Sequence, residues 1–169
     1  MAIRLDTPLG PMLARFDDAA LTALQFCTDQ EADAGQPARQ PLERALSEQL
    51  QRYFDGALAH FDLPLAPQGS PFSTAVWRAL QHIPYGQTAA YADIARAVGH
   101  PKAARAVGRA NGANPICIII PCHRVVRTGG AIGGYGGGIE RKRVLLDIER
   151  RAMAAATAAP LPSTTAAAA

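Results

Sequence analysis

The first part of the chain alternates short apolar runs with residues that favour turns. The runs lie at 2–5, 12–16 and 21–26, and the turn residues between them are Pro8-Leu9-Gly10-Pro11 and Asp17-Asp18. Short apolar runs bounded by proline, glycine and aspartate are typical of strands, so this pattern predicts three strands in a meander.

A polar stretch follows at 28–41 and is expected to form a loop. Beyond it the apolar residues recur every three or four positions: Leu42, Ala45, Leu46, Leu50 and Phe54. This spacing places them on one side of a helix, which we expect to cover one face of the sheet. Residues 59–69 have the composition of an extended connector that could include a further short strand.

From residue 71 the pattern becomes helical. One side of the first helix carries Phe72, Val76, Trp77, Leu80 and Ile83, and the helix is expected to end before Pro84. An apolar stripe of this kind predicts core packing rather than a cofactor site.

A pair of short helices is expected next. Thr88 is the expected N-cap of a helix that runs to about Val98, and Gly99 ends it. The following helix is expected from Lys102 to about Asn111. Two short helices joined by a tight turn that contains glycine predict a helix-turn-helix unit.

The second helix of this pair has few bulky side chains. Arg105 and Arg109 lie four residues apart on one face, and the small residues are Ala103, Ala104, Ala106, Gly108, Ala110 and Gly112. A helix this thin suits close backbone approach to another surface, since reading base edges in the major groove normally uses Asn, Gln, Arg or Lys. A tightly packed internal helix is equally compatible with this composition.

The most informative chemical signal is a cysteine after an apolar run. Residues 116–120 are apolar and mostly β-branched, which predicts a strand buried on both faces. Pro121 ends this strand and leaves the thiol of Cys122 next to two basic residues, His123 and Arg124. Because nearby cations or a helix N-terminus lower the pKa of a thiol, Cys122 is a candidate nucleophile.

How His123 would act on Cys122 is open at this point. Neighbouring side chains on an extended strand point to opposite faces. Either the backbone turns into a helix here, or His123 acts on the thiol through a water molecule. On a helix expected at 140–150, Glu149 could orient His123 as the third member of a Cys-His-acid relay, or it could pair with a surface arginine.

A glycine-rich segment separates these two elements. Residues 129–138 hold seven glycines around Tyr135. The segment does not follow a strand and open a helix in the register of a dinucleotide-binding motif. Glycines let backbone N–H groups approach a ligand closely, and Tyr135 could form a pocket wall; a merely flexible loop is the alternative.

The composition excludes several classes of protein. Hydrophobic residues make up 49% and charged residues 18% of the chain, a balance typical of a folded protein with a core. No run approaches the roughly 18 consecutive apolar residues of a membrane span, and the N-terminus lacks the apolar region of a secretory signal. We therefore expect a soluble, cytoplasmic protein without a membrane partner.

The three cysteines, Cys27, Cys117 and Cys122, are irregularly spaced and include no CxxC pair. They are expected to be free thiols in a reducing compartment. Cys27 and His60 alone do not make a tetrahedral zinc site, so we expect no metal, and no other cofactor is indicated.

The net charge of +3 combines two opposite parts. Residues 1–70 carry five basic and ten acidic side chains, residues 71–150 carry eleven basic and four acidic ones, and Arg151 adds one positive charge. The second part is a candidate for binding a polyanion, although a merely basic surface fits the same numbers.

The charge boundary near residue 70 predicts two unequal domains. We expect a scaffold domain at 1–70 and a domain at 71–152 that carries the candidate chemistry. Residues 153–169 are almost entirely Ala, Thr, Pro and Ser, which predicts a low-complexity tail that is disordered or forms a fraying helix extension.

Four sequence blocks resemble those of one family in their order and spacing. They are Arg105-Ala106-Val107-Gly108, Asn114-Pro115, Ile120-Pro121-Cys122-His123-Arg124-Val125, and Gly133-Gly134-Tyr135 through Glu149. Over residues 71–150 the chain resembles the O6-alkylguanine-DNA alkyltransferases, also called methylated-DNA–protein-cysteine methyltransferases. Residues 1–70 match loosely, by a Thr-Pro-Leu-Gly strand-turn pattern.

The resemblance implies an α/β (α+β) fold, with a small N-terminal domain of sheet plus helix and a mainly helical C-terminal domain containing a helix-turn-helix. It implies direct reversal of DNA alkylation, in which a cysteine takes the alkyl group from the guanine oxygen once per molecule. The implied partner is duplex DNA carrying O6-alkylguanine, with O4-alkylthymine as a further candidate. A monomer would bind the minor groove with little sequence preference and flip the base out of the stack.

The resemblance also assigns roles to individual residues. The chemistry falls to Cys122 as alkyl acceptor, His123 as water-mediated general base, Glu149 as the group that orients the histidine, Tyr91 as hydrogen-bond donor to the guanine ring, and Asn114 as support of the turn beside the thiol. DNA contacts fall to Arg105, which would replace the flipped nucleotide in the stack, and to Lys102, Ala104, Arg109 and Arg124. The base pocket falls to Tyr91, Val125, Tyr135 and Gly136.

Two positions depart from the family's pattern. Ala90 and Gly136 stand where members often have serine. The backbone N–H of Gly136 could still reach the guanine oxygen, and the smaller side chains could admit longer alkyl groups. Cys117 is expected either near the pocket wall or, more simply, as a core thiol.

Three other functions fit parts of the pattern. An alkyltransferase-like protein that binds lesions without repairing them replaces the nucleophile, which is present here as Cys122. A helix-turn-helix regulator is disfavoured by the small residues of the candidate recognition helix. A hydrolase with repeated turnover would use Cys122, His123 and Glu149.

Overall fold

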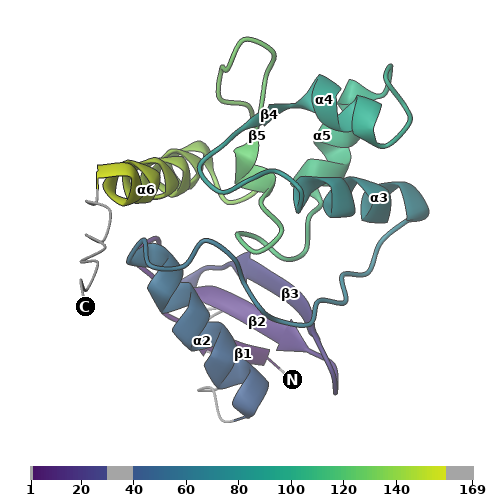
Figure 1. Ribbon diagram of the computed structural model, residues 1–169. Coiled ribbons are helices and arrows are strands. Elements are labelled where there is room, and N and C mark those ends of the chain that lie inside the picture. Colours follow the sequence, from purple (N-terminus) through teal and green to yellow (C-terminus); the bar gives the residue numbers. More distant parts are fainter. Residues whose placement is uncertain (1, 30–39, 159–169) are drawn as a thin grey trace, which may run out of the picture.

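The N-terminal part of the chain is a small sheet with one helix beside it (Figure 1). The computed structural model describes residues 2–29 and 40–158. Strands β1 (Ala2–Leu5), β2 (Met12–Phe16) and β3 (Leu21–Phe26) form an antiparallel sheet in the order β1-β2-β3. The predicted meander is confirmed, whereas most of the loop predicted at 28–41 lies outside the described residues.

Helix α2 (Pro41–Phe54) confirms the helix predicted from the apolar spacing. Its start is fixed by Pro41 at the first position and by the Glu43 carboxylate, which accepts the backbone N–H of Gln40 at 2.9 Å. The helix buries Leu46, Leu50 and Tyr53 in the core.

The outer edge of β3 is covered by two segments from elsewhere in the chain. The connector forms one parallel bridge there, between Leu65 and Leu21. Farther along β3, the N–H of Leu24 donates to the carbonyl of Pro115 and the N–H of Cys117 donates to the carbonyl of Leu24, both at 2.8 Å. These bonds tie the segment before Cys122 to the sheet.

The C-terminal part contains three packed helices, α3 (Pro71–Leu80), α4 (Tyr91–Ala97) and α5 (Ala104–Gly112). The hydroxyl of Ser70 caps α3 by accepting the N–H of Ser73 at 3.2 Å. The indole N–H of Trp77 donates to the carbonyl of Ala110 at 2.8 Å, which holds α3 against α5.

Two helix starts differ from the prediction. Helix α4 begins at Tyr91, without Thr88 as its cap, because residues 89–90 form strand β4 (Ala89–Ala90) and pair in parallel with β5 (Val125–Val126). The Asp93 carboxylate then accepts the N–H of Ala90 at 2.8 Å and caps the helix. Helix α5 begins at Ala104 because residues 101–102 form a turn.

The strand predicted at 116–120 is wrong. Within the described residues, Ile116 makes a single bridge to β3, and residues 117–119 form a turn in which Ile118 adopts a φ of +72°. The run is nevertheless buried, with Ile116, Ile118 and Ile120 at most 1% exposed. Its apolar character reflects burial, which a turn and a strand can share.

Helix α6 (Ile139–Ala158) extends past the end expected at residue 150. Of the two alternatives expected for the tail, residues 153–158 follow the helix extension, because alanine favours continuation of the helix. Residues 159–169 lie outside the described part of the chain.

The two halves share one hydrophobic core. Figure 1 shows the sheet and α2 on one side, and α3, α4 and α5 on the other, with the segment before β5 passing between them. This mixed arrangement of a small antiparallel sheet and several helices is the fold class expected from the sequence. No helix within residues 2–29 and 40–158 is long and apolar enough to cross a membrane.

Candidate functional site

The segment 114–124 positions Cys122 at the junction of the two halves. Asn114 shapes the turn: its side-chain amide donates to the carbonyl of Ile120 at 2.8 Å, and its oxygen accepts the N–H of Ile116 at 3.0 Å. The backbone then turns into the short 3-10 helix η1 (Cys122–Arg124). From α5, the side-chain amide of Asn111 donates to the carbonyl of Cys122 at 3.2 Å.

The thiol of Cys122 is buried and easier to ionise than an ordinary cysteine. A hydrogen bond from the thiol of Cys117 lowers the pKa of Cys122, and burial opposes this effect. The amide of Asn114 and the charge of Lys142 lower this pKa further. The pKa of Cys117 is raised by the same contact, so Cys117 is the partner that keeps its proton.

His123 is fully buried and paired with Glu149. The distance from its Nε2 to Oε1 of Glu149 is 2.7 Å. Because a carboxylate can only accept, Nε2 carries the proton and Nδ1 has the free lone pair. Nδ1 has no hydrogen-bond partner among the described residues, so it is the atom that can accept a proton through a water molecule.

Four groups hold the carboxylate of Glu149. Arg124 donates from Nε to Oε2 at 2.9 Å and from a terminal nitrogen to Oε1 at 3.0 Å, and the N–H of Gly86 donates to Oε2 at 3.0 Å. The hydroxyl of Tyr53 donates to Oε1 at 2.8 Å, beside the bond from His123. Burial would raise the pKa of Glu149, but His123 and Arg124 outweigh it and hold the value at about 2.

His123 is neutral at physiological pH in this setting. Burial lowers its pKa, Glu149 raises it, and the charges of Arg124 and Lys142 lower it again, with a net decrease from 6.5. A neutral imidazole beside an ionised carboxylate is the state that a general base requires before it receives a proton.

Lys142 of α6 organises the glycine-rich segment from inside. Its buried ammonium donates to the carbonyl of Val125 at 2.6 Å and to those of Gly133 and Gly134, each at 3.4 Å. A side chain at Gly133 would collide with Tyr91, since a Cβ there would lie 2.8 Å from the phenol oxygen. The glycine thus allows this loop to lie against α4.

A hollow of about 440 Å³ on the surface brings together residues of α4, α5 and the segment after β5. Tyr91, Arg105, Gly108 and Arg127 line it. Burial raises the pKa of Tyr91, and the negative charge of the nearby Cys122 adds to this. The phenol therefore keeps its proton and can donate a hydrogen bond next to the thiol.

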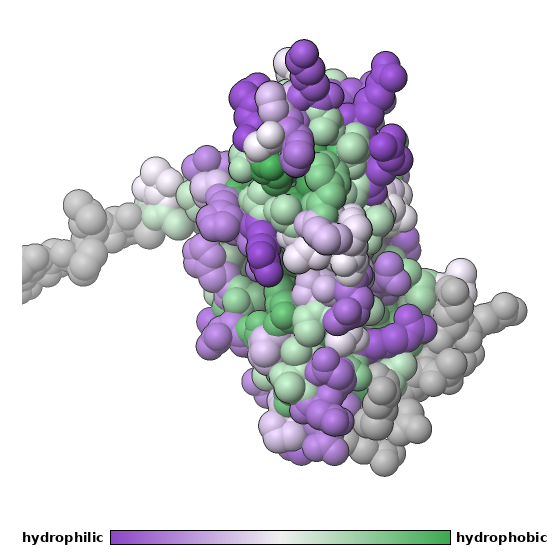
Figure 2. Space-filling model, turned by 90° about the vertical axis from the view of Figure 1, so that its right-hand side faces the viewer, coloured by the Kyte–Doolittle hydropathy of each residue, from purple (hydrophilic) through white to green (hydrophobic). Residues whose placement is uncertain are grey.

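The basic side chains expected to face DNA divide into two groups. Lys102, Arg105 and Arg109 are exposed on or next to α5, and Ala104 lies half-buried between them. Figure 2 shows hydrophilic side chains projecting around more apolar surface at the end of the molecule that carries α4 and α5. Arg124 is not brought to this surface, because its guanidinium is inside, bound to Glu149 and to the carbonyl of Ile83 at 2.7 Å.

Of the three other pocket residues, Tyr135 lies within electrostatic reach of the buried thiol. Val125 is buried directly after η1, and Gly136 is exposed on the glycine-rich segment. The ring of Tyr135 is largely buried, and burial together with the charges of Cys122 and Cys117 raises its pKa. All the residues expected to do chemistry therefore gather near Cys122, whereas Arg124 takes a different place from the one expected.

Sequence reasoning missed several groups that touch the site. Tyr53 and Asn111 each contribute one polar group, a hydroxyl and a side-chain amide, from helix faces that are otherwise apolar. Gly86 contributes only its backbone N–H. No motif marks them. Lys142 is the one group that the sequence could have indicated. It lies three residues before Leu145 and therefore on the same, buried face of the last helix.

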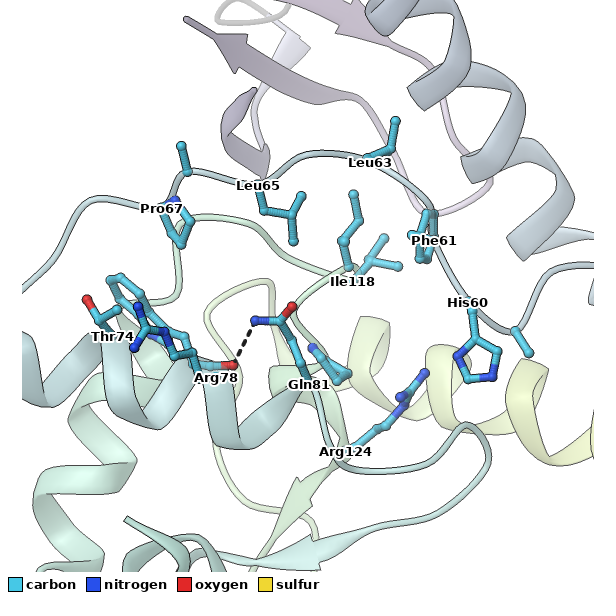
Figure 3. A pocket seen from close by; sticks show the side chains of 15 residues that line it. His60, Phe61, Leu63, Leu65, Pro67, Thr74, Arg78, Gln81, Ile118 and Arg124 are labelled. Carbon is cyan, nitrogen blue, oxygen red and sulfur yellow. Dashed lines mark hydrogen bonds between the residues drawn. The ribbon is translucent and has the colours of Figure 1, made fainter. Parts of the chain in front are cut away.

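A larger cavity of about 560 Å³ is lined by Pro121 and Arg124, on either side of Cys122 in the sequence, and Figure 3 shows it. The connector contributes Phe61, Leu63 and Leu65 to it, and Ile118 and Arg124 reach it from the C-terminal part. Cys122 is not among its lining residues, so this cavity is separate from the thiol.

A buried thiol of lowered pKa, a histidine–carboxylate pair and an adjacent basic surface are the arrangement of a cysteine-dependent enzyme. Sequence profiles of 6-O-methylguanine DNA methyltransferase match the chain in two parts: the ribonuclease-like domain over residues 3–67 and the DNA binding domain over residues 71–151. The chain belongs to the 6-O-methylguanine DNA methyltransferase family, which confirms the resemblance noted in the sequence.

Relatives and solved structures agree with this assignment. The methylated-DNA–protein-cysteine methyltransferase of Mycolicibacterium paratuberculosis is 47% identical over 150 residues, which cover 87% of this chain and 90% of the relative. That of Methanosarcina acetivorans is 43% identical over 147 residues, covering 85% and 94%. The crystal structure of Mycobacterium tuberculosis OGT in complex with DNA superposes with a TM-score of 0.80 at 43% identity, covering 89% of this chain and 93% of that one.

Proposed function

We propose that the chain repairs duplex DNA by moving the alkyl group of O6-alkylguanine onto Cys122, once per molecule. Methyl transfer from DNA to a protein cysteine is the activity of the family to which the chain belongs. The observation that carries the choice of Cys122 is its buried thiol of lowered pKa beside His123 and Glu149.

The proposed reaction balances with the groups present. The proton of Cys122 passes through a water molecule to Nδ1 of His123, and Glu149 stabilises the resulting imidazolium. The thiolate forms a bond to the alkyl carbon, the bond from that carbon to the guanine oxygen breaks, and its electron pair moves into the guanine ring. The phenol of Tyr91 donates a hydrogen bond to a ring nitrogen as negative charge develops there. The guanine anion then takes up a proton from water at a ring nitrogen, and the imidazolium of His123 returns its proton to water. The thioether is stable, so no second turnover follows.

The surface around α5 is suited to presenting a flipped base. A guanine inside a duplex cannot reach a buried thiol, so the nucleotide has to leave the stack. Arg105 is exposed at the hollow lined by Tyr91 and would fill the vacated space, while Lys102 and Arg109 bind phosphates. The small residues of α5 suit a close approach to the minor groove with little readout of the base sequence. We expect the protein to bind DNA as a monomer.

The domain boundaries and the substrate range belong to the same proposal. Residues 1–70 form the scaffold and residues 71–152 bind DNA and accept the alkyl group. Because Gly136 offers no side chain to the pocket, we expect O4-alkylthymine and alkyl groups longer than methyl to be accepted as well.

Intact-protein mass measurement tests the proposal. After incubation with duplex DNA containing O6-methylguanine, we expect one methyl group per protein, located by peptide mapping on Cys122, together with restored guanine. The Cys122→Ser variant is expected to bind the same duplex and remain unmodified. Unmodified protein that keeps the lesion bound would indicate a lesion binder, and repeated product release without an adduct would indicate a hydrolase; either result overturns the proposal.

A further inference from the structure

One side chain of the N-terminal half reaches the proposed reaction centre. Tyr53, in the last turn of α2, is fully buried. Its hydroxyl lies 2.8 Å from Oε1 of Glu149 and 3.4 Å from Nε2 of His123, although α2 precedes both residues by a long stretch of chain. Tyr53 is the only group of the sheet-and-helix half, within residues 2–29 and 40–70, with a hydrogen bond to this pair in the structure.

The direction of the hydrogen bond from Tyr53 is determined by its surroundings. Burial and the neighbouring Glu149 charge raise the pKa of Tyr53 well above its ordinary value, so the hydroxyl keeps its proton. Glu149 is ionised and can only accept. The hydroxyl therefore donates to Oε1, the same oxygen that accepts from His123.

The tyrosine ring holds this hydroxyl in place. Aromatic rings of Phe54, Phe61 and Tyr85 surround it with centroid distances of 5.6, 5.5 and 6.1 Å. A ring packed on several sides has one orientation, so its hydroxyl is a rigid donor. Oε1 is thereby placed between two fixed donors, and the bond to His123 can form in only one geometry.

We propose that Tyr53 is a positioning residue for alkyl transfer, which fixes the Glu149 carboxylate and through it the ring of His123, so that Nδ1 is left to accept the proton. This inference rests on the proposed roles of Cys122 and His123. It gives the N-terminal half a part in the chemistry beyond support, because α2 places the hydroxyl and the sheet places α2.

The hydroxyl of Tyr53 also tunes the base. By donating to Oε1 it disperses part of the carboxylate charge that would otherwise stabilise protonated His123. Without this bond, His123 holds a proton more firmly, and the fraction of neutral histidine falls at the acid end of the pH range. The rate of alkyl transfer should then begin to decline at a higher pH.

A neighbouring tyrosine offers a matched control. Tyr85 is buried next to Tyr53, but its hydroxyl has no hydrogen-bond partner in the described part of the chain. Tyr53→Phe and Tyr85→Phe remove the same atom from the same region, and one of the two changes breaks the bond to Glu149. A purely structural role for aromatic packing predicts similar consequences for both variants.

The test measures single-turnover alkyl transfer from O6-methylguanine duplex DNA over a range of pH, with binding of the same duplex and urea unfolding measured in parallel. For Tyr53→Phe we expect a rate about tenfold lower on the plateau, since general-base catalysis as a whole is worth about 10²- to 10⁴-fold, and an acid limb displaced to higher pH. Binding of the duplex should be unchanged. Tyr85→Phe should match the unmodified protein in rate and pH profile.

A second substitution covers the case in which Tyr53→Phe does not fold. Site-specific incorporation of 3-fluorotyrosine at position 53 keeps the ring shape and makes the hydroxyl a stronger donor. We then expect the acid limb to move to lower pH, opposite to the effect of Tyr53→Phe.

Four results decide the matter. A pH profile unchanged by fluorination, or a folded Tyr53→Phe variant that reacts at the normal rate, overturns the role of Tyr53. Equal loss of rate in Tyr53→Phe and Tyr85→Phe overturns it too, since packing would then explain the effect. If the unmodified protein forms no adduct on Cys122, the proposed function itself fails, and this outcome is distinguishable from the others.

Discussion

At the scale of single residues, the site depends on which atom of each pair holds the proton. The thiols of Cys117 and Cys122 interact, and this interaction together with the charges and donors around Cys122 favours ionisation of that thiol. His123 and Glu149 share a hydrogen bond in which the carboxylate is ionised and Nδ1 remains free to accept. These assignments follow from burial and from neighbouring groups, because the pKa of an unperturbed cysteine or histidine is the same at every position in a chain.

Replacing Cys117 with alanine should make Cys122 harder to ionise. The change removes the largest contribution that lowers the pKa of Cys122. A hydrogen bond to a charged group is worth about 1.5–3 kcal/mol, so the midpoint of thiol ionisation should rise by at least about one pH unit. The ultraviolet absorbance of the thiolate, followed against pH, measures this midpoint.

Cys27→Ala is the control for the loss of a thiol. Cys27 is half-buried in the N-terminal half, where its thiol donates to the carbonyl of Pro11 at 3.4 Å. We expect the midpoint of Cys122 to stay where it is in this variant. An identical midpoint in Cys117→Ala would show that the contact between the two thiols has no influence on ionisation.

At the scale of elements, α5 links the outer surface to the thiol. Its exposed side carries Arg105 and Arg109, while its buried side holds Asn111 against the carbonyl of Cys122. Trp77 fixes the helix from α3. The exposed face of α5 is therefore linked to Cys122 through a single helix.

Arg105→Ala should slow repair in duplex DNA while leaving the reaction with free O6-benzylguanine nearly intact. The free base needs no flipping, whereas an extruded nucleotide would leave the gap that we propose Arg105 to fill. Unstacking costs a few kcal/mol, so we expect at least about a tenfold slower transfer at saturating duplex.

Arg109→Ala is the control for Arg105→Ala, because it removes one positive charge from α5 without removing the side chain proposed to support base flipping. Both residues are exposed on α5, and both variants should bind duplex DNA more weakly with a shallower salt dependence. At saturating duplex, Arg109→Ala should transfer the alkyl group at the normal rate. Equal rate losses in Arg105→Ala with duplex and with free base would contradict a role in flipping.

At the scale of the whole molecule, the acidic N-terminal half and the basic C-terminal half meet at the site. The strand β3 pairs with the segment before Cys122, and α2 contributes Tyr53 to Glu149. Arg141 of α6 adds a further link, since its guanidinium donates to the carbonyl of Leu9 at 2.8 Å and lies over the ring of Phe26. The site therefore exists only in the assembled protein.

The stability of the assembled protein should depend on pH through Glu149. Its pKa is about 2 when folded and 4.5 ordinarily, so its contribution of about 3 kcal/mol is fully present above about pH 4.5 and lost as the pH falls toward 2. The pKa of His123 is also lowered, so the unfolded chain takes up a proton first and stability begins to fall below pH 6.5. Urea unfolding at several pH values measures both effects.

Glu149→Gln should lower the free energy of unfolding at neutral pH and flatten its decline in acid. Glu140→Gln is the matched control, because Glu140 is an exposed carboxylate on the same helix, paired with Arg143. Its unfolding curve should follow that of the unmodified protein. A Glu149→Gln curve of unchanged shape would refute the assignment of the acid dependence to this carboxylate.

The sequence by itself predicted most of the elements and the candidate reactive residues. Apolar periodicity placed the meander, α2 and α3, and glycine ended α4 at Gly99, where φ is +79°. The block around Cys122 indicated the candidate nucleophile and its histidine. These features are local, since they depend on residues a few positions apart whose spacing is written in the chain.

Only the tertiary structure decided how distant groups meet. It turned the apolar run at 116–120 into a loop with Ile118 at φ +72°, because pairing with β3 and the amide of Asn114 outweigh the strand preference of isoleucine. It also placed Arg124 inside on Glu149, and Tyr53 beside the same carboxylate. A buried charge needs partners, and which side chains supply them depends on how the halves pack rather than on any local pattern.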